Sequence, residues 1–180
     1  TVIPPDTRHL DYQVIPLNDS LGCLYKCGFC RVKNNNRFNE LSEAEIDVQL
    51  DRLKKLLADD LVNFNSIFLG QHDALNCTPQ LICSAVEHAH KRLGLRGSYI
   101  DGSNTFLFGS VGSLLNAGEE LFDELDRLPG RIFINIGLES ADQSTLDILE
   151  KPLLAAEVSA AFSKIQSLNR RCRTVEITVN

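Results

Sequence analysis

Short apolar runs alternate along the chain with longer segments in which apolar residues recur every three or four positions. The runs have the length of buried strands, and the recurring positions share one face of a helix. Pro16 lies within the first run, so it must sit at a strand end or a sheet edge. The predicted strands are 12–17, 66–69, 105–108, 131–136 and 175–179. Their alternation with helices predicts an α/β fold with a parallel sheet and right-handed crossovers.

The helix boundaries carry local signals. Ser42 and Glu45 have the spacing of a capping box, so a helix should begin near Ser42. Thr78–Pro79 predicts the start of a second helix, and Gly94 predicts its end. The other predicted helical segments are 114–128 and, interrupted near Pro152, 142–168. Periodicity alone leaves open whether the sheet is flat and doubly wound or curls into a barrel.

Composition limits the class of protein. The chain has 180 residues, 43% of them hydrophobic and 23% charged, which suits one globular domain. The formal charge is −6 and no basic run stands out, so we expect no general binding of nucleic acid. No stretch approaches the length of a membrane span, and residues 1–6 lack the pattern of a signal peptide. We therefore expect a cytoplasmic protein with no membrane partner.

The six cysteines are unevenly spread. Cys23, Cys27 and Cys30 lie within eight residues, directly after the first predicted strand. A secreted disulfide framework would be shorter and denser in cysteine, so a reducing compartment and a metal site fit better. The remaining cysteines are predicted to be free thiols: Cys77, Cys83 and Cys172.

The cysteine loop has the chemistry of a catalytic metal site. Thiolates are soft anionic ligands that suit iron–sulfur clusters, and Gly28 lets a short loop turn tightly. Clusters that only shuttle electrons usually have a cysteine on every iron. Three cysteines leave one iron of a [4Fe–4S] cluster open, and an open position is typical of catalytic metal sites. We therefore predict that Cys23, Cys27 and Cys30 bind a catalytic [4Fe–4S] cluster.

The spacing C-x3-C-x2-C after a first strand, with Lys26 and Phe29 each preceding a cysteine, resembles the radical S-adenosylmethionine (SAM) superfamily. The resemblance implies that the open iron binds S-adenosyl-L-methionine. It implies reductive cleavage to a 5′-deoxyadenosyl radical, which abstracts hydrogen from an unidentified substrate. A flavodoxin or ferredoxin would be the reductant. The protein's part is to orient the cofactors and exclude water.

The resemblance extends to the fold and to the ends of two further strands. It implies a partial (β/α)6 TIM-like barrel, of which residues 1–180 form the radical SAM core with about five strands, incomplete at the C-terminus. Gly70 and Asp73 match in kind a motif that binds the SAM amino group, although Gln71 and Ala74 depart from it. The Gly-Leu-Glu-Ser segment ending in Glu139–Ser140 resembles that of coproporphyrinogen oxidase and methylthiotransferase relatives.

By this resemblance Phe29, Gly70, Asp73, Glu139 and Ser140 would contact the cofactors. Simpler interpretations exist: loop packing for Phe29, a solvated turn for Asp73, and helix capping by Ser140 or Asp142 for the last segment. Two functions compete with the enzyme, namely a zinc-stabilised α/β interaction domain and an iron–sulfur redox sensor without turnover. Two histidines of the second predicted helix, His88 and His90, are expected at the surface.

Overall fold

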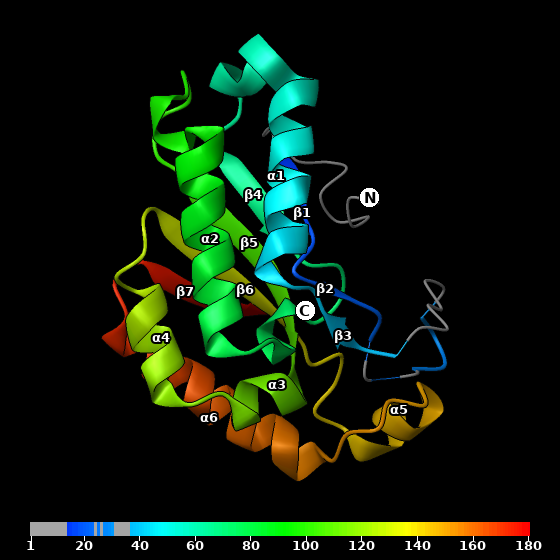
Figure 1. Ribbon diagram of the computed structural model, residues 1–180. Coiled ribbons are helices and arrows are strands. Elements are labelled where there is room, and N and C mark those ends of the chain that lie inside the picture. The colour runs from blue at the N-terminus through cyan, green and yellow to red at the C-terminus, as the bar shows by residue number, and fades with distance from the viewer. Residues whose placement is uncertain (1–13, 24, 26, 31–36) are drawn as a thin grey trace.

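A five-stranded parallel sheet forms the centre of the molecule, with strand order β1-β4-β5-β6-β7 (Figure 1). The computed structural model describes residues 14–23, 25, 27–30 and 37–180. The strands are β1 (Val14–Leu17), β4 (Ser66–Leu69), β5 (Asn104–Ser110), β6 (Arg131–Gly137) and β7 (Val175–Val179). All five predicted strands are confirmed, except that positions 12 and 13 of the first lie outside the described residues.

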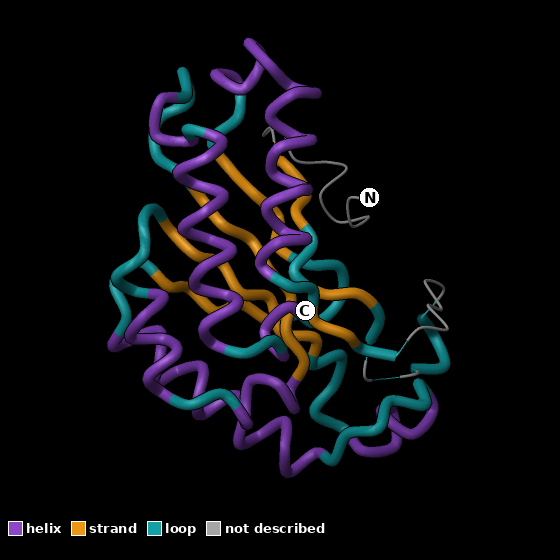
Figure 2. Tube along the Cα trace, viewed as in Figure 1, coloured by secondary structure: helices purple, strands orange, loops and turns teal. Residues whose placement is uncertain are grey.

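The strand order answers the question that periodicity left open. Each strand of the sheet pairs with the next one along the chain, without the reversal that divides a doubly wound sheet. When successive right-handed crossovers all proceed in one direction, their helices lie on the same face of the sheet. Figures 1 and 2 show α1 and α2 along one side of the strands, with α4 and α6 continuing this layer. This is the arrangement of a barrel sector.

The helices follow the predicted segments, with one difference. The segment 114–128 is not a single helix, because the chain breaks at Ala117–Gly118 and separates α3 from α4. The α-helices are α1 (Glu43–Leu57), α2 (Pro79–Leu93), α3 (Val111–Asn116), α4 (Glu119–Leu125), α5 (Gln143–Ile148) and α6 (Ala155–Arg171). Short 3-10 helices are η2 (Ala58–Asn63), η3 (Ala74–Asn76) and η4 (Leu95–Gly97). Within the described part of the chain, no helix is long and apolar enough to cross a membrane.

The two faces of the sheet differ in character. On β6 the isoleucines at 132, 134 and 136 are fully buried in the core. The alternate residues of β5 and β6 lie on the opposite, inner face, where Phe106 stacks on Phe133 with ring centroids 5.2 Å apart. Further along this face Asn135 donates a hydrogen bond to Thr178. The inner face is therefore aromatic at mid-strand and becomes polar towards the carboxyl ends.

Local signals in the sequence set most helix ends. Ser42 and Glu45 form both bonds of the predicted capping box at the start of α1. Gly94 ends α2 with φ +66°, in the left-handed region that glycine enters without strain. The expected surface position of His90 is wrong: it is buried, and its Nε2 lies 3.1 Å from the Thr105 hydroxyl. An imidazole on the sheet-facing side of α2 is thus held by a polar residue of β5.

A small hairpin closes the base of the cysteine loop. Strands β2 (Ser20–Leu21) and β3 (Asn39–Glu40) pair antiparallel. The amide of Leu41 also donates to the Asp19 carbonyl at 2.8 Å. In the described sheet β1 is an edge strand, so Pro16 occupies the kind of position predicted for it.

Candidate functional site

The carboxyl ends of the parallel strands bring the predicted site residues to one edge of the sheet. The cysteine loop follows β1 and β2, the segment from Gly70 to Asp73 follows β4, and the Glu139 turn follows β6. In barrels built from parallel strands, loops at this edge carry the catalytic groups. The fold therefore gathers segments that lie more than a hundred residues apart in the sequence.

Cys23, Cys27 and Cys30 lie half-buried at this edge. The Cys30 amide donates to the Cys27 carbonyl at 3.2 Å, which turns the end of the loop. Burial raises the pKa of the Cys27 thiol, the Lys151 ammonium acts in the opposite direction, and the other two cysteines add to the rise. The other two cysteines of the loop therefore lie close enough to Cys27 to act on its thiol. Lys26 lies outside the described residues.

The thiols do not converge on a single point. Among residues 14–23, 25, 27–30 and 37–180, no three Cys, His, Asp or Glu side chains are grouped so as to hold one metal ion. A cubic cluster makes a different demand, because each cysteine binds a different iron atom. Three half-buried thiols on one loop provide the number and type of ligands for such a cluster. Phe29, beside Cys30, is 47% exposed at the mouth of the loop.

Asp73 is buried rather than solvated. Its Oδ1 accepts hydrogen bonds from the Ser110 amide at 2.9 Å and from the Ser113 hydroxyl at 2.7 Å. Burial raises its pKa, and these serine contacts partly offset the rise. Its Oδ2 is buried and has no hydrogen-bond partner among the described residues. Asp73 thus links the loop after β4 to the start of α3 through Oδ1, while its Oδ2 makes no hydrogen bond to the described residues.

Gly70 is required by the close approach of two segments. Its φ is +76°, and a Cβ there would lie 2.7 Å from the Ala74 Cβ and 2.8 Å from Asp19 Oδ1. The Gly70 amide donates to the Leu17 carbonyl at 2.8 Å. This glycine therefore lets the loop after β4 close over the end of β1.

Glu139 and Ser140 form a strained turn at the end of β6. Glu139 has φ +64°, which is uncommon for a residue with a side chain. Its amide donates to the Asn180 carbonyl at 3.1 Å, and its Oε1 accepts from Lys151 Nζ at 2.7 Å. Ser140 Oγ accepts from the amide of Asp142, which is itself the N-cap of α5. The capping interpretation thus holds for Asp142, and the Glu139 carboxylate is already engaged by a cation.

Sequence reasoning missed the segment Leu149–Lys151, which joins the cysteine loop to the Glu139 turn. Helix α5 ends in a Schellman motif, since the Lys151 amide donates to the Leu146 carbonyl at 3.0 Å. Glu150 fills the left-handed position with φ +50°, where glycine is usual. Because this position holds glutamate and not glycine, the sequence has no glycine that would have predicted the end of the helix. The Leu149 carbonyl then accepts from the Gly28 amide at 3.2 Å.

Gly28 serves this contact as well as a tight turn. A Cβ at Gly28 would lie 2.5 Å from Glu150 Oε2 and 3.0 Å from Glu150 Cβ, so a side chain at position 28 would require the Glu150 side chain to move. The predicted tight turn is present, because the Cys30 amide bonds to the Cys27 carbonyl across Gly28 and Phe29, although Gly28 is not among the described glycines with positive φ. Gly28 therefore serves both the turn and the contact with a distant segment of the chain.

Asp19 is a second group that sequence reasoning did not select. It is fully buried, its Oδ1 accepts from the Ser20 hydroxyl at 2.9 Å, and its Oδ2 has no hydrogen-bond partner among the described residues. Burial raises its pKa to about 7. Burial also raises the pKa of the Cys77 thiol, and the Asp19 carboxylate beside it adds to this. As predicted, Cys77, Cys83 and Cys172 are free thiols.

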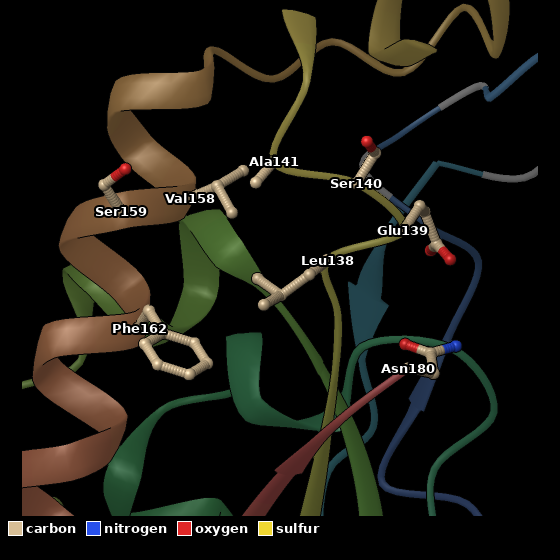
Figure 3. A pocket seen from close by; sticks show the side chains of 8 residues that line it. All are labelled: Leu138, Glu139, Ser140, Ala141, Val158, Ser159, Phe162 and Asn180. Carbon is tan, nitrogen blue, oxygen red and sulfur yellow. The ribbon is translucent and has the colours of Figure 1, made fainter.

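A cavity of about 530 Å³ opens on the α6 side of the Glu139 turn (Figure 3). Its volume falls in the range of small-molecule sites. In Figure 3 the Leu138 side chain points towards Phe162 on α6, whereas the Glu139 carboxylate points to the other side of the loop. The lining residues are Leu138, Glu139, Ser140, Ala141, Val158, Ser159, Phe162 and Asn180.

Comparison with solved structures finds one protein in three states. The cobalamin-dependent S-adenosylmethionine radical enzyme OxsB, in its apo form, matches with a TM-score of 0.60 and 16% identity, over 94% of this chain and 24% of OxsB. The form with aqua-cobalamin gives 0.60 and 16%, over 91% and 23%. The form with aqua-cobalamin and S-adenosylmethionine gives 0.58 and 17%, over 92% and 23%.

No protein-family model and no curated protein matches the sequence. The chain spans about a quarter of the length of OxsB. At this identity the likeness concerns architecture alone. The chain therefore has an α/β fold with a five-stranded parallel sheet that matches part of a radical SAM enzyme.

Proposed function

We propose that this chain is the core of a radical SAM enzyme, in which Cys23, Cys27 and Cys30 bind a [4Fe–4S] cluster that cleaves S-adenosyl-L-methionine reductively. One observation carries the proposal. A loop with three half-buried, interacting thiols stands at the carboxyl edge of a sheet whose architecture is shared with a radical SAM enzyme. Neither the cysteine spacing nor the fold would support it as well alone.

The cluster and SAM together would supply a 5′-deoxyadenosyl radical that takes a hydrogen atom from the substrate. The chain's residues have the simpler tasks of holding and orienting. Cys23, Cys27 and Cys30 would hold the cluster and leave one position open for the SAM amino and carboxylate groups. The half-exposed Phe29 would cover the mouth of the loop and limit the access of water.

Glu139 and Asp73 are the acidic groups that we assign to SAM. The Glu139 carboxylate lies near enough to Cys27 to act on its thiol, and its Oε1 is fixed by Lys151. Its second oxygen is then positioned to accept a hydrogen bond from an ammonium or a ribose hydroxyl. Asp73 would offer the unpartnered Oδ2, while Oδ1 stays bonded to the serines of the next loop. Gly70 and Ser140 would shape the backbone around these carboxylates.

The substrate and the reductant are proposed only by class. A flavodoxin or ferredoxin would deliver the electron. The polar pair of Asn135 and Thr178 lies on the inner face, on β6 and β7. A substrate bound over this face would meet hydrogen-bonding groups near the site and aromatic rings deeper in.

Anaerobic reconstitution of the full-length protein tests the proposal. Iron, sulfide, dithionite and SAM are added, and iron content, visible absorption and 5′-deoxyadenosine are measured. Wild type and Cys83→Ala should both carry a cluster and form product, because Cys83 lies on α2, outside the cysteine loop. Cys27→Ala should lose cluster and product together.

Three results would contradict the proposal. Tightly bound zinc without iron–sulfur absorption would support the interaction domain. A stable cluster without 5′-deoxyadenosine would support the redox sensor. Full product formation by Cys27→Ala would refute the ligand assignment.

A further inference from the structure

Lys151 stands at a junction of three segments. Its Nζ donates to the Gly137 carbonyl and to Glu139 Oε1, both at 2.7 Å. The Lys151 side chain is only 10% exposed, so these bonds form largely out of water. Its own segment, two residues earlier, accepts the Gly28 amide of the cysteine loop. A single ammonium therefore joins the end of β6 to the piece of chain on which the cysteine loop rests.

The backbone at this junction is strained in two places. Of the described residues, three that are not glycine have positive φ: Ala58, Glu139 and Glu150. Two of these three lie at the junction, at the β6 turn and immediately before Lys151. Such conformations cost about 1–3 kcal/mol each and persist where the surroundings impose them, often at functional sites. The Lys151 bonds hold the strained β6 turn, and the Gly28 contact packs against the strained Glu150.

We propose that Lys151 is a positioning residue, which clamps the Glu139 turn and the cysteine loop into one geometry. This inference rests on the proposed function. An ammonium has three donors, and the two used here are charge-assisted bonds that fix both the backbone and the carboxylate of the turn. Lys151 also lies two residues after Leu149, whose carbonyl accepts the amide of Gly28, the residue next to Cys27. Lys151 thus sets where the Glu139 carboxylate stands relative to the cysteine loop and places a positive charge beside that loop.

Lys164 provides a matched control. Its Nζ donates to the Ala117 carbonyl at 2.6 Å and to the Leu115 carbonyl at 3.4 Å, so it also holds a backbone turn with a partly buried ammonium. That turn joins α3 to α4, and none of its residues belongs to the proposed site. Lys164→Met should therefore show the loss of stability that follows from removing a partly buried lysine, without a change in the cysteine loop or the Glu139 turn.

The experiment compares wild type with Lys151→Met, Lys151→Arg and Lys164→Met in the full-length protein. Before reconstitution, amide hydrogen exchange is followed in peptides covering 27–30 and 137–140. After reconstitution, the midpoint potential of the cluster and the dissociation constant for SAM are measured. For Lys151→Met we expect faster exchange in both peptides. We also expect an approximately tenfold weaker affinity for SAM, because a charge-assisted bond to the turn is lost.

The potential should respond as well. Loss of a positive charge beside the cluster disfavours the reduced form, so the midpoint potential of Lys151→Met should become more negative. Lys151→Arg should recover most of the potential and of the SAM affinity. Lys164→Met should change none of these quantities.

Gly28→Ala is a second variant that leaves Lys151 intact. The new methyl group would push against the Glu150 carboxylate and lift the loop from α5. We expect faster exchange in 27–30 but not in 137–140, together with weaker SAM binding. This variant separates the docking of the loop from the bonds made by the ammonium.

The outcomes are distinct. Unchanged exchange in Lys151→Met, in a protein whose wild type cleaves SAM, overturns the positioning role alone. Faster exchange with unchanged potential and SAM affinity overturns it too, since Lys151 would then be merely structural. If wild type takes up no cluster, the proposed function fails and the positioning role falls with it.

Discussion

Replacing Asp19 with Asn should remove a pH dependence from the stability of the protein. Asp19 is fully buried at the end of β1, and burial raises its pKa to about 7 from an ordinary value of 3.8. Below pH 4 the group is neutral in both the folded and the unfolded chain. As the pH rises from 4 to 7 the unfolded chain ionises while the folded one resists, so stability falls, and above 7 the loss levels off. The Glu40 carboxylate nearby adds to the shift.

The magnitude follows from the size of the shift. Each pKa unit corresponds to 1.36 kcal/mol, so the two units between pH 5 and pH 7 amount to about 3 kcal/mol. The assay is urea denaturation followed by circular dichroism at pH 5, 6, 7 and 8, for wild type, Asp19→Asn and the exposed control Asp59→Asn. The wild type and the control should lose about 3 kcal/mol more than Asp19→Asn across this range. The proteins are compared by how their free energies of unfolding change with pH, because burying the Asn amide lowers the stability of Asp19→Asn by an amount that does not depend on pH. Parallel pH profiles for wild type and Asp19→Asn would refute the reasoning.

Two further predictions concern stability. Gly70→Ala should lower the free energy of unfolding by about 3 kcal/mol, because φ is positive at this position and the new methyl group would clash with Ala74. Gly94→Ala should cost only about 1 kcal/mol, because φ is positive there too but the space around it is open. Equal losses for the two variants in urea denaturation would contradict the packing argument. Asp126→Ala should cost about 2 kcal/mol, because Oδ1 accepts from the backbone amides of residues 173–175 at the start of β7. Hydrogen bonds from these residues lower the pKa of Asp126, although burial acts in the opposite direction. The contribution of the Asp126 carboxylate to stability is therefore present at neutral pH and lost on acidification. An unchanged acid limb of the stability profile in Asp126→Ala would count against this role.

The elements of the fold could be predicted because their signals are local. Apolar runs and helix faces follow the periods of the two kinds of secondary structure, and the capping box at Ser42 forms as its spacing indicates. The periodicity of apolar residues did not reveal the break between α3 and α4 at Ala117–Gly118, so the two helices were predicted as one. The expectation for His90 failed for another reason: its spacing from Val86 and Leu93 places it on the buried face of α2, and only its polar side chain pointed to the surface.

The site was only partly predictable, for a physical reason. The cysteines could be selected by their number and spacing, and Asp73 and Glu139 by their resemblance to family motifs that follow strands. The clamp at Lys151 was not visible, because it depends on a Schellman motif with glutamate where glycine is usual. Contacts such as Gly28 to Leu149 join segments that nothing in a single sequence links.

The junction between the cysteine loop and α5 has a consequence for the order of assembly in the cell. In the five-stranded sheet, each strand after β1 pairs with the strand of this sheet that precedes it in the chain. The sheet can therefore grow from the N-terminus as synthesis proceeds. The cysteines emerge first, yet the Leu149 carbonyl that receives the loop is made about 120 residues later. At a ribosomal rate of about 5–20 residues per second, the thiols wait for many seconds without their support. Insertion of the proposed cluster would therefore follow the folding of β6 and α5, because a metal delivered earlier would meet a loop that is not yet docked.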